Sequence, residues 1–164
     1  MLRTARFITR CNFILFSSAK WLVVVIAALM LFEVLSRYSF SSPTSWAPEL
    51  ATLLFGPFFL LGGPYLLHTS GHVSVDVLSS SAKGIVDKLL KVAAIALAVA
   101  FGGILFWFSY PLALDSFQYR ETSYTSWNPQ IWPVKLVLPT AMGLLVLQAI
   151  AELIFLFSDE KEAE

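Results

Sequence analysis

The chain of 164 residues is too apolar for a soluble domain of its size: 57% of its residues are hydrophobic, only 13% are charged, and its mean hydropathy is +0.74. Its 11 basic and 11 acidic residues give a net charge of zero, which excludes a general attraction to nucleic acid. The single cysteine, Cys11, excludes an internal disulfide and is expected to be a reduced cytosolic thiol. We therefore predict an all-α integral membrane protein with one domain over residues 1–164.

The N-terminal segment, residues 1–20, is basic and interleaved with apolar side chains. It carries Arg3, Arg6, Arg10 and Lys20 and no acidic residue. This pattern predicts an amphipathic helix at the membrane interface. A secretory signal is the alternative, but the following apolar run contains no small-x-small cleavage site, which favours a retained signal-anchor.

The first predicted crossing, residues 21–38, contains a charged pair. Glu33 would be costly within the membrane, but Arg37 follows four residues later, in the favourable order for an intrahelical ion pair. Two interpretations stay open at this point. The pair either satisfies itself structurally, or one of its members contacts a partner protein.

The second predicted crossing covers residues 49–67. Between positions 50 and 67 only Thr52 has a polar side chain, and these 18 residues are about the length that an α-helix needs to cross the hydrocarbon core. Trp46, Pro48 and Glu49 at its start suit a membrane interface and a helix N-terminus. A polar segment follows at His68.

The third predicted crossing, residues 92–110, is rich in alanine and glycine. Ala94, Ala98 and Gly102 are spaced four apart and form a seam that would let another helix approach closely. The sequence leaves open whether this neighbour belongs to the same chain or to another subunit. A loop of aromatic and polar residues is expected over 111–132.

The fourth predicted crossing covers residues 133–157, with Pro139 causing at most a tolerated kink, and an acidic tail follows at 158–164. Four crossings place both termini on one side of the membrane. Eight basic residues lie on that side and three on the other, so the positive-inside rule predicts that both termini are cytoplasmic.

Motifs for chemistry are absent from the sequence. It contains no phosphate-binding glycine loop, no nucleophile elbow and no zinc-type cysteine pair, so we expect neither an enzyme nor a bound cofactor. His68, His72 and Asp76 would share a helix face and could bind a metal, but Gly71 indicates that the helix has ended there. We expect instead that His72 and Asp76 organise the turn. Apolar crossings without repeats also argue against an independent transporter or a channel.

Several motifs occur in a distinctive order: Arg37-Tyr38, Ser45-Trp46-x-x-Glu49, Gly71-His72-Val-x-Val-Asp76 and Pro129-x-x-Trp132-Pro133. With this order and spacing, residues 33–147 closely resemble the small membrane subunit (DctQ type) of tripartite ATP-independent periplasmic (TRAP) transporters. The resemblance implies a bacterial inner-membrane complex with a large elevator-type membrane subunit and a periplasmic solute receptor. It also implies sodium-driven uptake of an organic acid, which the sequence does not identify.

The resemblance and the apolar helices together predict a scaffold that anchors the large subunit. The residues expected to serve structure or this interface are Glu33, Arg37, Tyr38, Trp46, Glu49, Gly71, His72 and Asp76. The residues expected to face the receptor are Asp115, Arg120, Glu121 and Trp127. The alternative function is a free-standing membrane assembly factor or small channel.

Overall fold

The computed structural model describes residues 2–69 and 85–158. The helices in these ranges are α1 (Leu2–Ala19), α2 (Leu22–Ser39), α3 (Trp46–His68), α5 (Ile85–Gln118) and α6 (Trp132–Phe157). The described residues contain no β-strand beyond one isolated bridge between Thr122 and Gln130. Gly71, His72, Asp76 and the acidic tail after Ser158 lie outside the described residues.

Within the residues that the structure describes, four helical stretches are long and apolar enough to cross a membrane: Leu2–Ser39, Trp46–His68, Lys88–Gln118 and Trp132–Phe157. The first of these joins α1 and α2, which are separated only by a turn at Lys20 and Trp21. The predicted all-α membrane fold with four spanning stretches is therefore confirmed. The cytoplasmic position of the termini and the interfacial position of the N-terminal segment stay predictions.

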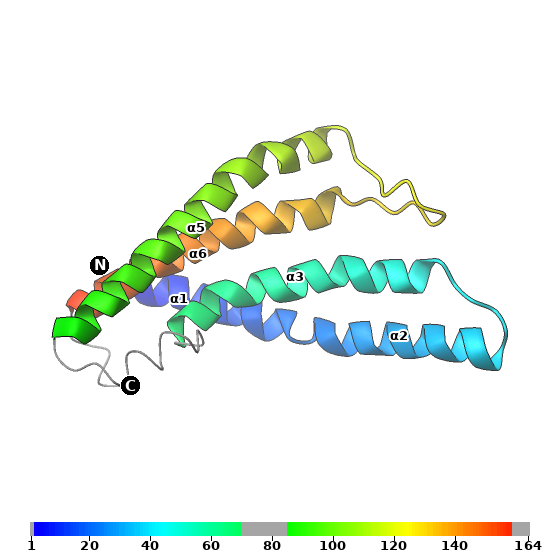
Figure 1. Ribbon diagram of the computed structural model, residues 1–164, viewed down its shortest axis with the longest axis horizontal. Helices are drawn as coiled ribbons and strands as arrows, with labels where there is room; N and C mark the ends of the chain where they lie inside the picture. The colour runs from blue at the N-terminus through cyan, green and yellow to red at the C-terminus, as the bar shows by residue number, and fades with distance from the viewer. Residues whose placement is uncertain (1, 70–84, 159–164) are drawn as a thin grey trace.

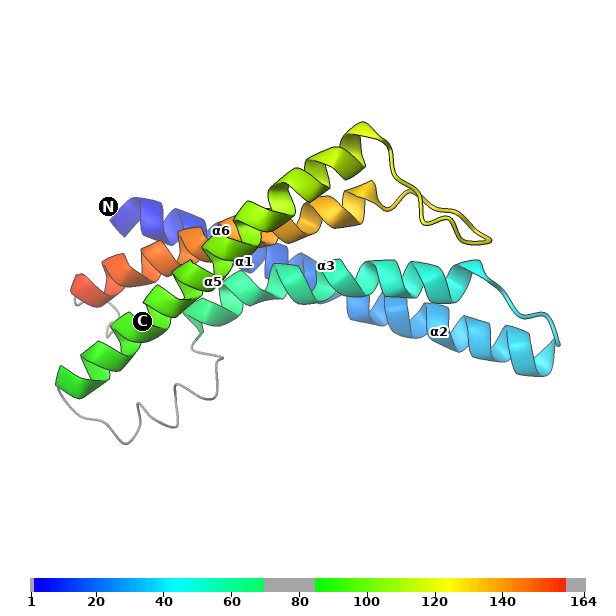
Figure 2. The same ribbon diagram turned by 45° about the horizontal axis from the view of Figure 1, so that its top comes forward.

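The chain is arranged as two helical hairpins, α2–α3 and α5–α6, with α1 packed against α3 and α6 (Figure 1). The hairpins lie close together near the end of α3. From there α5 and α6 diverge from α3, and the α5–α6 loop bends back toward the start of α3 (Figures 1 and 2). We call the end formed by residues 40–45 and 119–131 the loop end. The opposite end is called the terminal end.

Small side chains allow α1 and α5 to approach α6 closely. Ala5 of α1 is fully buried against Ala151 and Phe155 of α6. Gly102 of α5 faces α6, because a Cβ atom added there would lie 3.0 Å from Val146 Cγ2 and 3.4 Å from the Met142 carbonyl oxygen. The seam predicted on the third crossing is thus used within the chain at Gly102.

The prediction that a loop begins at residue 111 is wrong. Helix α5 continues through Pro111 to Gln118, so Asp115 lies on a helix rather than in a loop. Proline removes one backbone hydrogen bond, but membrane helices commonly accommodate it, and Pro57, Pro64 and Pro139 also lie inside helices here. The irregular segment contains only residues 119–131.

Helix α1 packs along its neighbours for much of its length. The rings of Phe16 and Tyr65 of α3 are stacked with centroids 5.1 Å apart, and Phe13 contacts the same tyrosine at 5.3 Å. The second half of α1 therefore extends the first hairpin toward the terminal end.

Helices α2 and α5 leave most of their apolar surface outside the fold. In the most apolar stretch of each of these two spans, 6% of the residues are buried, compared with 39% in α6. Helix α6 is therefore the central helix of the molecule, while α2 and α5 present apolar faces to lipid or to another protein.

Candidate functional site

The carboxylate of Glu33 is buried near the loop end and accepts several hydrogen bonds. Glu33 is only 3% exposed. Its carboxylate pairs with the guanidinium of Arg37, one helical turn later in α2. The second carboxylate oxygen accepts hydrogen bonds from the Thr44 hydroxyl and from the Thr44 backbone N–H at 3.0 Å. Three donor groups therefore satisfy a charge that would otherwise be costly in this position.

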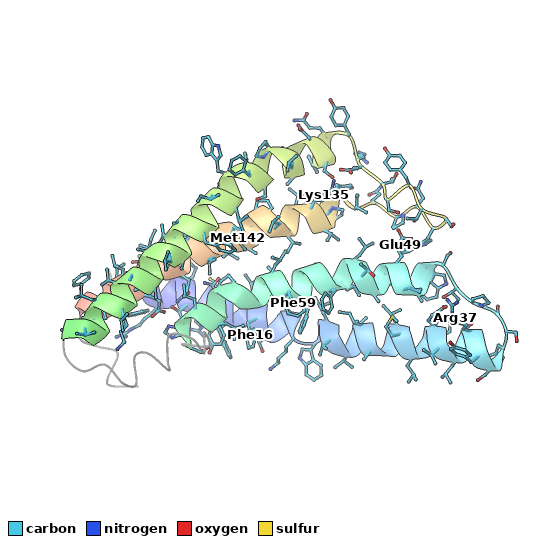
Figure 3. The ribbon with its side chains drawn as sticks, in the orientation of Figure 1. Phe16, Arg37, Glu49, Phe59, Lys135 and Met142 are labelled. Atoms are coloured by element: carbon cyan, nitrogen blue, oxygen red, sulfur yellow. The ribbon has the colours of Figure 1, made fainter. Side chains whose placement is uncertain are left out.

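The contacts of Glu33 fix the turn between α2 and α3, beside Arg37 in Figure 3. The Ser36 hydroxyl donates to the Ser42 carbonyl oxygen at 2.6 Å, and the Ser42 N–H donates to the Ser36 carbonyl oxygen at 3.0 Å. The predicted Glu33–Arg37 pair is present in the structure. The role of Thr44 was not predicted, because it depends on how α3 folds back on α2.

Trp46 and Tyr38, the aromatic residues of the sequence motifs, differ in how they pack. Trp46 packs its ring against Phe32 of α2 with centroids 5.6 Å apart, so it helps to hold the hairpin together. Tyr38 is 78% exposed. Of these two residues, only Trp46 has a packing role within the described chain.

Glu49 connects the two hairpins at the loop end. Both of its carboxylate oxygens lie 2.7 Å from the Thr125 hydroxyl of the α5–α6 loop. Figure 3 shows Glu49 on the side of α3 that faces this loop. The first turns of α3 and the loop also line an open pocket of about 490 Å³, which includes Pro48, Leu53 and Ser126.

The α5–α6 loop is an ordered hairpin. The Ser123 N–H donates to the Pro129 carbonyl oxygen and the Ile131 N–H to the Glu121 carbonyl oxygen, each at 3.0 Å. The Asn128 side chain accepts from the Tyr124 N–H at 2.9 Å across the tip. Arg120, Tyr124 and Asn128 have positive φ angles of 46°, 55° and 52°, so this backbone shape is held by its local hydrogen bonds.

Glu121 fixes the base of the loop to α6. Its carboxylate oxygens lie 2.7 and 2.6 Å from the Lys135 ammonium. The hydrogen bonds from this ammonium, together with its charge, lower the pKa of Glu121 below its usual range. Glu121 is therefore ionised at neutral pH and engaged within the chain.

The other three residues expected to face a receptor lie in different places: Arg120 and Trp127 are in the α5–α6 loop, and Asp115 is on α5. Arg120 is exposed at the start of the loop, and Trp127 is 39% exposed near its tip. Asp115 lies on the last turns of α5, where it lines a second pocket with Glu121 and Lys135. Of the four candidates, Arg120 and Trp127 lie on the exposed part of the loop.

A buried polar cluster near the terminal end was missed by sequence reasoning. Asn12 of α1 donates from Nδ2 to Gln148 Oε1 of α6 at 2.8 Å, and both residues are at most 1% exposed. Gln148 Nε2 in turn donates to Thr9 Oγ1 and to Glu152 Oε1, each at 3.0 Å. His68 Nδ1 of α3 lies 2.5 Å from the same Glu152 oxygen. The cluster thus joins α1, α3 and α6.

A signal for this cluster exists in the sequence. Gln148 and Glu152 are polar residues in an otherwise apolar span, and such residues usually face the interior of a bundle, whereas Asn12 follows basic residues and gives no such signal. Their pairing follows only from the packing of three helices. Within the described residues, no three histidine, cysteine, aspartate or glutamate side chains come together to hold a metal ion.

Polar contacts in the described residues therefore join helices and loops, and the remaining surface of the spans is largely apolar. The fold and these contacts define a multi-pass α-helical membrane protein. The chain belongs to the family of tripartite ATP-independent periplasmic transporters, DctQ component, whose model matches residues 26–159. The predicted family is therefore confirmed. Its members are transporter components, and it is not an enzyme family. Comparison with individually curated proteins gave no match.

Proposed function

We propose that this chain is the small permease subunit that anchors and scaffolds a large elevator-type subunit in the bacterial inner membrane. In this role it supports receptor-dependent, sodium-driven uptake of an organic acid. A moving transport domain needs a fixed surface beside it, and a rigid helical bundle can enlarge that surface. Membership of the family supports the existence of partner subunits.

The observation that carries this proposal is the face of α5 directed away from α6. Ala93, Ala96, Ala100 and Gly103 are exposed along this face. A Cβ atom added at Gly103 would meet no atom within 4 Å. Small residues give little contact with lipid chains, but they let a second helix come close enough for backbone packing. We therefore propose this face of α5 as the contact with the large subunit.

The test is co-purification of the large subunit with variants of the full chain. Ala100→Leu adds a bulky side chain to the proposed contact and should reduce recovery of the complex at least severalfold. Ala28→Leu makes the same change on the exposed surface of α2 and serves as the matched control. Wild-type recovery with Ala100→Leu would exclude this face.

The scaffold role itself has a separate test. Expressed without its partner, the chain should aggregate or be degraded, because the proposed contact face of α5 stays uncovered by protein. Co-expression with the large subunit should restore its yield. A chain that purifies alone as a stable monomer and does not bind the candidate large subunit would instead support a free-standing membrane protein.

A further inference from the structure

A pocket of about 540 Å³ lies at the loop end between the last turns of α5, the start of α6 and the α5–α6 loop. Its volume is within the range of small-molecule sites. One side of its lining is apolar and consists of Leu112, Ala113 and Leu138. The other side is polar and includes Asp115, Ser116 and Lys135. The pocket therefore suits a ligand that has both apolar and polar parts.

The charges in this pocket favour a cationic group. Glu121 and Lys135 compensate each other through their 2.6 Å ion pair. Asp115 also lines the pocket, and no ion pair involving its carboxylate occurs among the described residues. One negative charge is thus left over. A primary ammonium group can donate charge-assisted hydrogen bonds to such a carboxylate.

The same pocket offers donors for an anion beside that cation. Ser116 is 3% exposed, and its hydroxyl oxygen lies near Glu121 without forming a regular hydrogen bond within the described chain. Buried hydroxyls are normally paired, so this oxygen indicates a missing partner. The Lys135 ammonium has three donors, of which two are directed to the Glu121 carboxylate.

The position of the pocket suits a lipid. It lies where two membrane-spanning stretches end, with Trp132 and Tyr119 nearby in the sequence as residues typical of the membrane interface. We propose that the pocket binds the headgroup of a phospholipid that carries a primary ammonium group, such as phosphatidylethanolamine. Asp115 binds the ammonium, Ser116 and Lys135 face the phosphate, and Leu112 and Leu138 contact the start of the acyl chains.

This proposal does not depend on which subunit the chain scaffolds, but the same chemistry occurs in a soluble amine. Native mass spectrometry of the full chain with its co-purified membrane partner can separate the two sources. The complex is titrated with phosphatidylethanolamine, phosphatidylcholine, phosphatidylglycerol or water-soluble phosphoethanolamine. We expect the first to bind most tightly. Equal Asp115-dependent binding of phosphoethanolamine would replace the lipid with a soluble amine and overturn the assignment.

Variants test the role of the carboxylate. Asp115→Asn should weaken binding of phosphatidylethanolamine by about tenfold, because a charge-assisted hydrogen bond is lost. Asp115→Glu keeps the charge and should keep the lipid preference, which excludes a folding defect as the cause. Asp87→Asn removes a carboxylate near the other end of α5, outside this pocket, and is the matched control. Unchanged binding by Asp115→Asn, or equal binding of phosphatidylglycerol by the wild type, would overturn the proposal.

Discussion

At the scale of single residues, Glu33 shows how an ionised side chain is accommodated in an apolar helix. The sequence predicted its partner Arg37, since i and i+4 residues lie on the same helix face. Thr44, in the turn between α2 and α3, donates hydrogen bonds to Glu33 from its hydroxyl and its backbone N–H. No local sequence pattern indicates these contacts. Intrahelical contacts could therefore be predicted, whereas contacts between segments required the packed structure.

The buried position of Glu33 leads to a prediction on stability. Glu33→Ala leaves the Thr44 N–H without its acceptor and should destabilise the hairpin by about 2–3 kcal/mol. Thr44→Val removes one hydrogen bond but keeps the ion pair, so its effect should be smaller. Thermal unfolding of the detergent-solubilised complex measures both. Equal melting temperatures for Glu33→Ala and the wild type would show that the cluster contributes nothing.

At the scale of helices, hydropathy predicted where the spanning stretches lie but not every boundary. Pro111 suggested a helix end, yet α5 continues to Gln118, because the local rule against proline is weaker than the packing of a long spanning helix. Asp115 therefore lies on helix α5, where it lines a pocket, and not in the predicted loop. The order of the α5–α6 loop could not be predicted either, since its local hydrogen bonds act together with contacts from the loop to Glu49 of α3 and Lys135 of α6.

The attachment of α1 to α6 provides a prediction for the polar cluster. Asn12→Leu should destabilise the protein, because it leaves the buried Gln148 side-chain oxygen without its donor, and Gln148→Leu should destabilise it by leaving the Asn12 side-chain amide N–H without its acceptor. The double variant removes both groups and should cost less than the sum of the single variants. The coupling is expected to be about 0.6–2 kcal/mol, as for hydrogen bonds between membrane helices.

Unfolding measurements on the four proteins of this double-mutant cycle check the prediction. A parallel assay is protease cleavage of the N-terminal segment, which should become faster in either single variant as α1 detaches. Strict additivity of the two single effects would mean that the hydrogen bond between Asn12 and Gln148 does not hold α1 in place.

At the scale of the whole molecule, the two hairpins are joined at both ends by polar contacts. The Asn12–Gln148–Glu152–His68 cluster connects α1, α3 and α6 at the terminal end, and Glu49 with Thr125 connects α3 and the α5–α6 loop at the other end. Apolar side chains cover the outside of the spans between these ends. Such an arrangement suits a rigid body, as the proposed scaffold role requires.

The loop end is also where a soluble receptor would dock if the termini are cytoplasmic. Reversing Glu121 would be a poor test of docking, because Glu121→Lys would place two ammonium groups together at the base of the loop. Arg120 is exposed, and no side-chain contact of its own holds the loop together in the described structure. Arg120→Glu therefore isolates the effect of surface charge.

We predict that Arg120→Glu raises the receptor concentration needed for half-maximal uptake severalfold and leaves maximal uptake unchanged. Exposed charges mainly affect encounter, so the difference should shrink as the salt concentration increases. Lys88→Glu reverses an exposed charge near the other end of α5 and is the matched control. Uptake in reconstituted vesicles, with receptor titrated at two salt concentrations, measures these effects. Identical receptor dependence in the two variants would remove the α5–α6 loop from the docking surface.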